Sequence, residues 1–255
     1  MGACVDVKQV ANVLELIEFF AERGRTATLA EISRHFDWPR SSTFNLLGTL
    51  VSRGYLYEPR AREGYYPSPR WQQLIGRIEH AAPVPARLHA LLQTLWERTG
   101  ETVVLAAISG SQALFIDTIE SPHSVRYSAP IGKLVPLHLT ATGRALLSLL
   151  PEPDRAAVLR KAVFERHTPS TLLSVASVEE EIARSQQRGW FESAAEFSPD
   201  LGGVAMALPL EQRQLAVLVG GPMFRVQPIY AQIAALMQQE VARQVELGAV
   251  ASAVA

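Results

Sequence analysis

From residue 28 to residue 54 the chain reads TLAEISRHFDWPRSSTFNLLGTLVSRG, a pattern typical of two consecutive helices. Thr28 and Glu31 have the spacing of a capping box, in which the hydroxyl accepts from an amide three residues on and the carboxylate reaches back. This predicts a short helix that runs to about Phe36. Pro39 is tolerated in the first turn of the next helix, which is predicted to continue to Arg53 and to end at Gly54.

The second of these helices has two unlike faces when its residues are spaced at roughly 100°. One arc is small and polar, and it holds Ser41, Ser42, Asn45, Gly48, Thr49 and Ser52. The opposite arc is apolar, and it holds Phe44, Leu46, Leu47, Leu50 and Val51. Short polar side chains let a helix approach the major groove, where Asn reads adenine and Arg reads guanine or binds phosphate. We therefore predict DNA contacts from Arg40, Ser41, Ser42, Thr43, Asn45 and Thr49.

The flanking sequence completes a winged helix-turn-helix. Apolar residues recur at steps of three and four from Val10 to Ala21, which predicts a first helix that ends near Gly24. Short aromatic runs at 55–58 and 64–67 predict a hairpin. Arg60 and Arg62 lie at its tip, where a wing contacts the DNA backbone or minor groove. The alternative interpretation is that the polar helix face and the tip arginines are only a solvated surface. The order of the elements, however, is more specific for a winged helix-turn-helix than any single element is.

Composition limits the classes of partner and site. The formal net charge of -1 excludes a uniformly basic coat, yet nine arginines and four acidic residues between positions 23 and 77 give that segment a charge of +5. Cys4 is the single cysteine, which excludes an intrachain disulfide and a Cys-based zinc site. The N-terminus lacks a signal-peptide pattern, and the longest apolar stretch is interrupted by His138 and Arg144. We expect a cytoplasmic protein with no membrane contact, no metal and no cofactor.

Proline residues mark the domain boundary. Ala81-Ala82-Pro83-Val84-Pro85-Ala86 opposes a continuous helix, so we expect a DNA-binding domain at 1–67, a linker helix at 68–82 and a further domain at 83–250. In that domain, Ser109-Gly110-Ser111-Gln112 separates two strand-like runs and predicts a hairpin. Helical patterns then alternate with strands at 204–210 and 215–219. The chain is expected to be α+β, with a largely antiparallel sheet flanked by helices in the second domain.

Short motifs in a fixed order resemble one known family. The first domain carries Leu29-Ala30-Glu31-Ile32, Pro39-Arg40-Ser41-Ser42-Thr43, Leu46-Leu47-Gly48-Thr49-Leu50 and Gly54-Tyr55-Leu56. The second domain carries Thr99-Gly100-Glu101-Thr102-Val103, Glu120-Ser121-Pro122, Pro136-Leu137-His138-Leu139-Thr140-Ala141-Thr142-Gly143-Arg144-Ala145, Arg188-Gly189-Trp190 and Gly220-Gly221-Pro222. In this order, and across nearly the whole chain, the motifs resemble the IclR-type bacterial transcriptional regulators.

The resemblance implies an N-terminal winged helix-turn-helix, a linker helix and a C-terminal mixed α/β effector-binding domain with a curved, largely antiparallel sheet. Such proteins assemble as homodimers or dimers of dimers on double-stranded operator DNA. The implied function is a sequence-specific transcriptional regulator whose operator binding responds to a small organic effector.

The resemblance also implies an effector pocket between the sheet and the helix that follows Thr140. Amides in the first turn of that helix suit a carboxylate, whereas the alternative for the threonine hydroxyls is that they only cap the helix. Where the family usually has a cysteine and serines, this chain has glycines and Leu218, which predicts a roomier, more apolar cavity that favours a larger or aromatic effector. The expected effector contacts are Leu137, Thr140, Ala141, Thr142, Glu196, Gly203, Val204, Leu218 and Gly220.

Two polar residues near the pocket have alternative roles. Glu196 matches an acidic position of the family and is expected to accept hydrogen bonds from an effector, although a solvated carboxylate at the rim is the commoner outcome in a Pro-containing loop. His138 has no second histidine at ligand spacing, so we expect it to be packed and hydrogen-bonded rather than metal-binding.

Two other classes of function remain open. The second domain could be an enzyme, but it contains no Gly-x-Ser-x-Gly, no His-Glu-x-x-His, no phosphate-binding loop and no cysteine, so no catalytic residue is predicted. A winged helix can also bind another protein instead of DNA. Steeply salt-dependent binding to DNA is the property that separates these interpretations.

Overall fold

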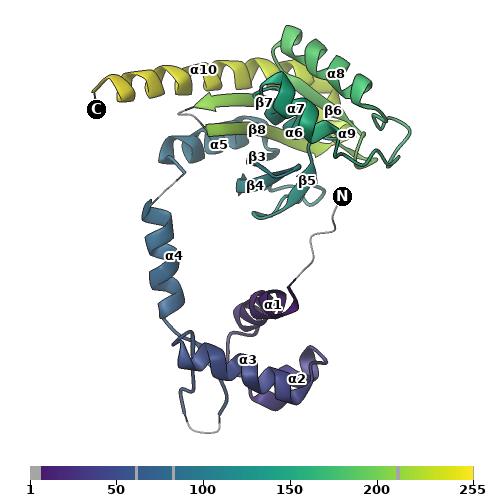
Figure 1. Cartoon of the computed structure of the whole chain (residues 1–255). Helices are drawn as coiled ribbons and strands as arrows, with labels where there is room; N and C mark the ends of the chain where they lie inside the picture. The colour runs from purple at the N-terminus through teal and green to yellow at the C-terminus, as the bar shows by residue number, and fades with distance from the viewer. Residues whose placement is uncertain (1–6, 61–62, 82–83, 211–212, 255) are drawn as a thin grey trace. The chain divides into compact units, whose positions relative to one another are not determined.

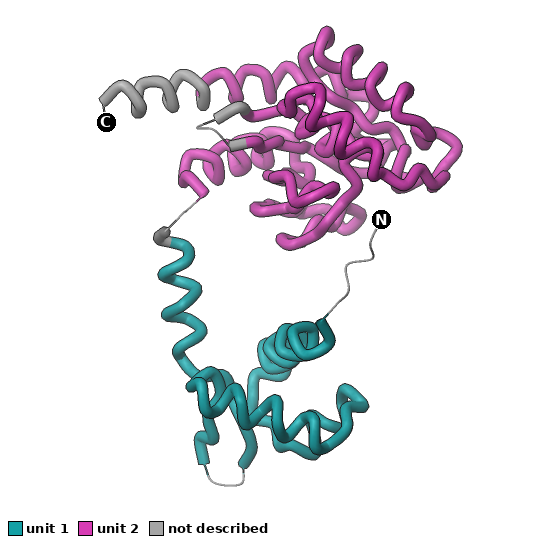
Figure 2. The backbone as a smooth tube through the Cα atoms, in the orientation of Figure 1, with its two compact units in different colours: residues 1–83 teal, residues 84–255 magenta. Residues whose placement is uncertain are grey.

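The computed structural model describes residues 7–60, 63–81, 84–210 and 213–254, and it divides into two compact units. The first comprises residues 1–83 and the second residues 84–255 (Figure 2). The division falls inside the proline-containing segment 81–86.

Three helices form the body of the first unit: α1 (Lys8–Arg23), α2 (Leu29–His35) and α3 (Arg40–Ser52). Gly24 ends α1 in the left-handed conformation, with φ of 64°, as the sequence predicts. The capping box of α2 is also confirmed: the Thr28 amide donates to Glu31 Oε2 at 2.9 Å, and the Glu31 amide donates to Thr28 Oγ1 at 3.3 Å. The turn between α1 and α2 is therefore set by local hydrogen bonds as well as by packing.

A small sheet follows the three helices. Strands β1 (Leu56–Tyr57) and β2 (Tyr66–Pro67) pair antiparallel, and an isolated bridge joins Ala27 to Tyr65. Leu56 packs into the same buried cluster as Ala27 and residues of all three helices, namely Leu16, Phe19, Phe20, Ile32, Leu47 and Leu50. Helix α4 (Arg70–Ala81) completes the unit, and Trp71 Nε1 donates to the Tyr55 carbonyl at 3.0 Å. The winged helix-turn-helix arrangement is thus present.

The second unit is built on a six-stranded sheet in the order β5-β4-β3-β8-β7-β6, and every pairing is antiparallel (Figure 1). In chain order its strands are β3 (Thr102–Ser109), β4 (Gln112–Ile119), β5 (Leu134–Pro136), β6 (Phe191–Ala194), β7 (Leu201–Leu210) and β8 (Arg213–Pro222). The predicted hairpin is β3 and β4. The expected α+β class with an antiparallel sheet is confirmed.

Helices cover both faces of this sheet. The helices of this unit are α5 (Ala86–Thr99), α6 (Ala141–Leu147), α7 (Glu152–Leu159), α8 (Val175–Arg188), α9 (Met223–Val226), the 3-10 turn η1 (Gln227–Ile229) and α10 (Tyr230–Val254). Helices α5 and α10 share one buried cluster with the sheet, and α6, α7 and α8 share the other. None of the described helices has the length and apolar character needed to cross a membrane.

Side chains of the central strands alternate between these two clusters. On β8, Val217 and Val219 lie in the α5/α10 cluster, whereas Ala216 and Leu218 lie in the α6 cluster. On β7, Val204 lies in the α5/α10 cluster and Ala205 in the α6 cluster. This alternation follows from the two-residue period of a strand, and it decides which residues can reach the α6 side.

Candidate functional site

The polar edge of α3 is open to solvent, as the sequence predicts. Its six members are all exposed, namely Ser41, Ser42, Asn45, Gly48, Thr49 and Ser52. Thr49 Oγ1 donates to the Asn45 carbonyl at 2.8 Å, but the Asn45 side-chain amide bonds to no described residue. Arg40 is exposed at the first position of the helix, and its guanidinium pairs with no carboxylate in the described part of the chain. A free amide and a free guanidinium are therefore accessible on α3.

Thr43 is a correction to the predicted DNA contacts. Its side chain is only 1% exposed, and its hydroxyl donates to the Pro39 carbonyl at 3.0 Å. The buried arc of α3 is centred on Thr43, Leu47 and Leu50, so the prediction that Thr43 faces DNA is wrong. Phe44 and Val51 lie at the margin of that arc and are exposed by 58% and 38%, although the sequence placed them on the covered side.

The hairpin tip was predicted to carry two basic contacts. The Arg60 side chain is 79% exposed, and it pairs with Glu63 at 3.4 Å. Exposed ion pairs of this kind contribute little to the free energy of folding. The guanidinium thus stays accessible. Arg62 lies outside the described residues.

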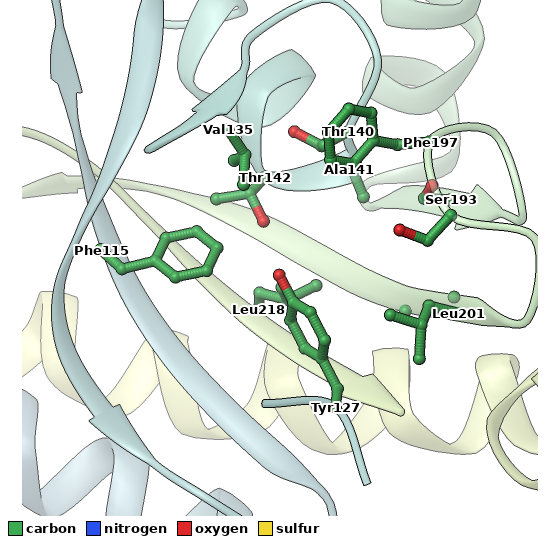
Figure 3. Close-up of a pocket in the computed structure, with 13 residues that line it drawn as sticks. Phe115, Tyr127, Val135, Thr140, Ala141, Thr142, Ser193, Phe197, Leu201 and Leu218 are labelled. Carbon is green, nitrogen blue, oxygen red and sulfur yellow. The ribbon is translucent and has the colours of Figure 1, made fainter. Parts of the chain in front are cut away.

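A pocket opens in the second unit between β8, β7, α6 and the segment before β5 (Figure 3). The space between its walls, together with the open solvent at its mouth, is about 460 Å³. It is lined by Phe115, Tyr127, Val135, Thr140, Ala141, Thr142, Ser193, Phe197, Ser198, Leu201, Gly202, Gly203 and Leu218. Five of the predicted effector contacts line it: Thr140, Ala141, Thr142, Gly203 and Leu218.

Two of the polar groups in this lining are already engaged by the protein. Thr140 Oγ1 accepts from the Gly143 amide at 3.0 Å and donates to the Pro136 carbonyl at 3.0 Å, so Thr140 caps α6. Ser193 Oγ donates to Glu196 Oε2 at 3.1 Å. The capping interpretation of Thr140 is therefore the one that its contacts support.

The other hydroxyls of the lining, those of Tyr127, Thr142 and Ser198, have no such partners among the described residues. Tyr127 and Thr142 point their oxygens into the same space, beside the Phe115 ring (Figure 3). Neither of these two hydroxyls forms a hydrogen bond with a described residue. The one hydrogen bond that Tyr127 accepts, from Thr102 Oγ1, is to its backbone carbonyl. Burial raises the pKa of Tyr127 to about 12, so the phenol stays protonated and can donate.

Four predicted contacts do not line the pocket. Glu196 is paired with the fully buried Arg144 at 2.7 Å, so its carboxylate is held behind the wall instead of facing an effector. Val204 points into the α5/α10 cluster because it follows Gly203 on the strand and the faces alternate. Leu137 is buried against α6, where its carbonyl abuts Gly143. Gly220 only borders the site, since an added Cβ there would lie 3.3 Å from the Tyr127 ring.

His138 is packed and hydrogen-bonded, as expected. It is 6% exposed, its Nε2 lies 3.2 Å from the Val163 carbonyl oxygen, and burial lowers its pKa. The described residues hold no group of three or more His, Cys, Asp or Glu side chains arranged to bind a metal ion.

Several pocket residues were not found by sequence reasoning. Tyr127 lies in an irregular segment, and Phe197 and Ser198 lie in the turn between β6 and β7. Irregular segments show no periodicity, so nothing in the pattern marks an inward side chain there. The sequence predicted that Phe115 lies in a strand. Because Phe115 and Ile116 are neighbours in that strand and point to opposite faces, this alternation was the one signal that could have placed Phe115 on the α6 side.

Comparison with protein families gives two matches. The model described as the IclR helix-turn-helix domain matches residues 9–60. The model described as Bacterial transcriptional regulator IclR C-terminal matches residues 78–247, well over half of the chain.

Individual proteins of known sequence or structure are also similar to this chain. The transcriptional repressor IclR of Escherichia coli K12 is 28% identical over 225 residues, which cover 86% of this chain and 82% of the relative. The crystal structure of the Thermotoga maritima IclR aligns with a TM-score of 0.72 at 19% identity, covering 93% of this chain and 98% of the other. An IclR homolog from Microbacterium hydrocarbonoxydans, complexed with 4-hydroxybenzoate, aligns with a TM-score of 0.67 at 20% identity, covering 92% and 99%.

Proposed function

The chain belongs to the IclR family of bacterial transcriptional regulators, and we propose that it binds operator DNA through α3 under the control of a small organic molecule bound in the pocket of the second unit. In this proposal residues 1–67 bind DNA, residues 68–82 form the linker, and residues 83–250 bind the effector and support oligomerisation.

The observation that carries the DNA-binding proposal is the open edge of α3. Arg40 and Asn45 are exposed and have no side-chain partner among the described residues. Their groups are those that read guanine and adenine in a major groove, and the neighbouring Ser41, Ser42 and Thr49 are short enough to allow close approach. Arg60 and Arg62 would contact the backbone or minor groove from the hairpin.

The effector proposal rests on the shape and lining of the pocket. A half-open space walled by apolar side chains with a few hydroxyls is typical of a site for a small organic molecule. The Microbacterium hydrocarbonoxydans homolog of this fold is complexed with 4-hydroxybenzoate. By analogy we place the effector of this chain among Thr142, Leu218 and the other pocket-lining residues.

We further propose that the protein acts as a homodimer or a dimer of dimers. Helix α4 exposes Ile75 by 61% and Ile78 by 71% on one helical face, which a second copy could cover. Two copies would also present two α3 helices to the half-sites of an operator. We propose no catalytic activity, since the family consists of transcriptional regulators.

The test of DNA binding uses the intergenic DNA upstream of the gene that encodes the chain. Fluorescence anisotropy at increasing salt should show an affinity that falls steeply, because each phosphate contact releases counterions. Protection mapping should then give one or more footprints. Binding that does not change with salt, or no footprint at all, would favour the protein-binding interpretation of the winged helix.

A further inference from the structure

The walls of the pocket are aromatic and apolar. Phe115, Tyr127 and Phe197 bring three rings to the lining, and Val135, Leu201 and Leu218 add aliphatic surface. Flat apolar walls favour a planar ring, which gains both burial and ring-to-ring contact. These side chains border one small space, which suits one ring better than an extended polycycle.

No charged side chain belongs to this lining. Arg144, on the helix that forms one wall, is fully buried and paired with Glu196. Moving an ionised group into apolar surroundings without a counter-charge is costly, whereas a neutral polar group needs only hydrogen-bonding partners. The side chains of the lining thus supply no counter-charge, and they favour an uncharged polar group.

The hydroxyls of Tyr127 and Thr142 supply such partners. They come from different walls, point into one space and bond to no described residue (Figure 3). A hydroxyl group on a ligand can accept from one of them and donate to the other, which matches the donor and acceptor capacity of both.

We propose that the effector is a one-ring phenol whose hydroxyl is bound between Tyr127 and Thr142. This inference rests on one part of the proposed function, namely that the pocket is the effector site. Phe115 and Leu218 would hold the ring, and Tyr127 would be the residue that separates a phenol from the same ring without its hydroxyl.

The experiment titrates the full-length protein with 4-methylphenol and with toluene by isothermal titration calorimetry. The probes differ by one hydroxyl, so the ratio of their affinities isolates its contribution. We expect 4-methylphenol to bind more tightly, and Tyr127→Phe to reduce the ratio about fivefold, the usual effect of one neutral hydrogen bond. Thr142→Val should reduce the affinity ratio similarly. If Tyr127→Phe does not fold, the Thr142→Val variant alone decides the question.

Tyr57→Phe is the matched control, because it removes an exposed tyrosine hydroxyl outside the pocket and should leave the ratio unchanged. Equal affinities of the wild-type protein for the two probes would overturn the proposal. So would an unchanged ratio in folded variants of both pocket residues, or tight binding of pyruvate with no binding of either ring. DNA binding is measured separately on ligand-free protein, so its failure would overturn the proposed function and leave the calorimetry interpretable.

Discussion

Arg144 and Glu196 form an ion pair of 2.7 Å behind the pocket wall, and the arginine side chain has no exposed surface. The same guanidinium also donates to the Glu192 carbonyl at 2.6 Å and to the His138 carbonyl at 3.4 Å. Glu196 in turn accepts from Ser193, which lines the pocket. One buried cation thus fastens α6, β6 and the turn after β6 around the proposed effector site.

Replacing this cation should be strongly destabilising. Arg144→Met would leave the Glu196 carboxylate and two carbonyls without their donor, which costs about 3–5 kcal/mol when a buried pair is broken. Chemical denaturation followed by circular dichroism measures the loss. The matched control is Arg184→Met, which removes a 60% exposed arginine from its pair with Glu181; Glu181 keeps its pair with Arg188, so stability should change by less than about 1 kcal/mol. Equal effects of the two substitutions would show that the Arg144 pair has no special role.

DNA affinity should depend on Arg40. Arg40→Ala removes an accessible guanidinium with no partner among the described residues, so the fold should be unaffected while operator affinity falls by about 1–3 kcal/mol. If the contact is to phosphate, the slope of log affinity against log salt should also decrease by about one. Anisotropy titrations at several salt concentrations measure both. Arg184→Ala, in the second unit, is the control; a wild-type affinity for Arg40→Ala would remove Arg40 from the interface.

Acid should weaken the first unit through Glu31. The hydrogen bond from the Thr28 amide, followed by those from Arg23 and the Thr28 hydroxyl, lowers the pKa of Glu31 from 4.5 to about 2. Because the folded-state pKa is the lower one, the stabilisation is present above about pH 4.5 and is lost as the pH falls toward 2. The denaturation midpoints of wild type and Glu31→Gln should therefore differ at about pH 6 and converge only at about pH 2 or below. Glu18→Gln, exposed on α1, serves as control, and a difference that does not change with pH would contradict the prediction.

Two helical glycines should respond oppositely to alanine. An added Cβ at Gly143 would overlap the Leu137 backbone, so Gly143→Ala should displace α6 and cost about 1–3 kcal/mol. At Gly48 a Cβ would meet nothing within 4 Å, and Gly48→Ala should stabilise the helix by about 0.5–1 kcal/mol. Denaturation midpoints test both, and a stabilising Gly143→Ala would mean that α6 does not press on Leu137.

The sequence predicted best where local chemistry determines structure. Thr28, Glu31 and Gly24 act on their own neighbours, so the ends of α1 and α2 followed from short motifs. The short edge strands β5 and β6 were not predicted, because three or four residues show no clear alternation. Their strand structure depends on β4 and β7, which lie beside them only after folding.

Sites formed by tertiary packing were only partly predictable. Threonine is a residue type common on protein surfaces, but Thr43 is buried in the folded chain. The local sequence around Glu196 is typical of a solvated carboxylate at a pocket rim, and only the folded structure brings Arg144 next to it. Tyr127 enters the pocket from an irregular segment that carries no periodic signal. The partner of Glu196, Arg144, is distant in the chain.

The opposite orientation of neighbouring residues on β7 and β8 has an evolutionary consequence. Gly203 and Leu218 touch the ligand space, while the adjacent Val204 and Val219 support the scaffold from the other side. Substitutions at every second position could therefore retune ligand preference without disturbing the packing that keeps the domain folded. A sheet arranged in this way allows descendants of one ancestral sensor to diverge in the metabolite they detect while their architecture is inherited unchanged.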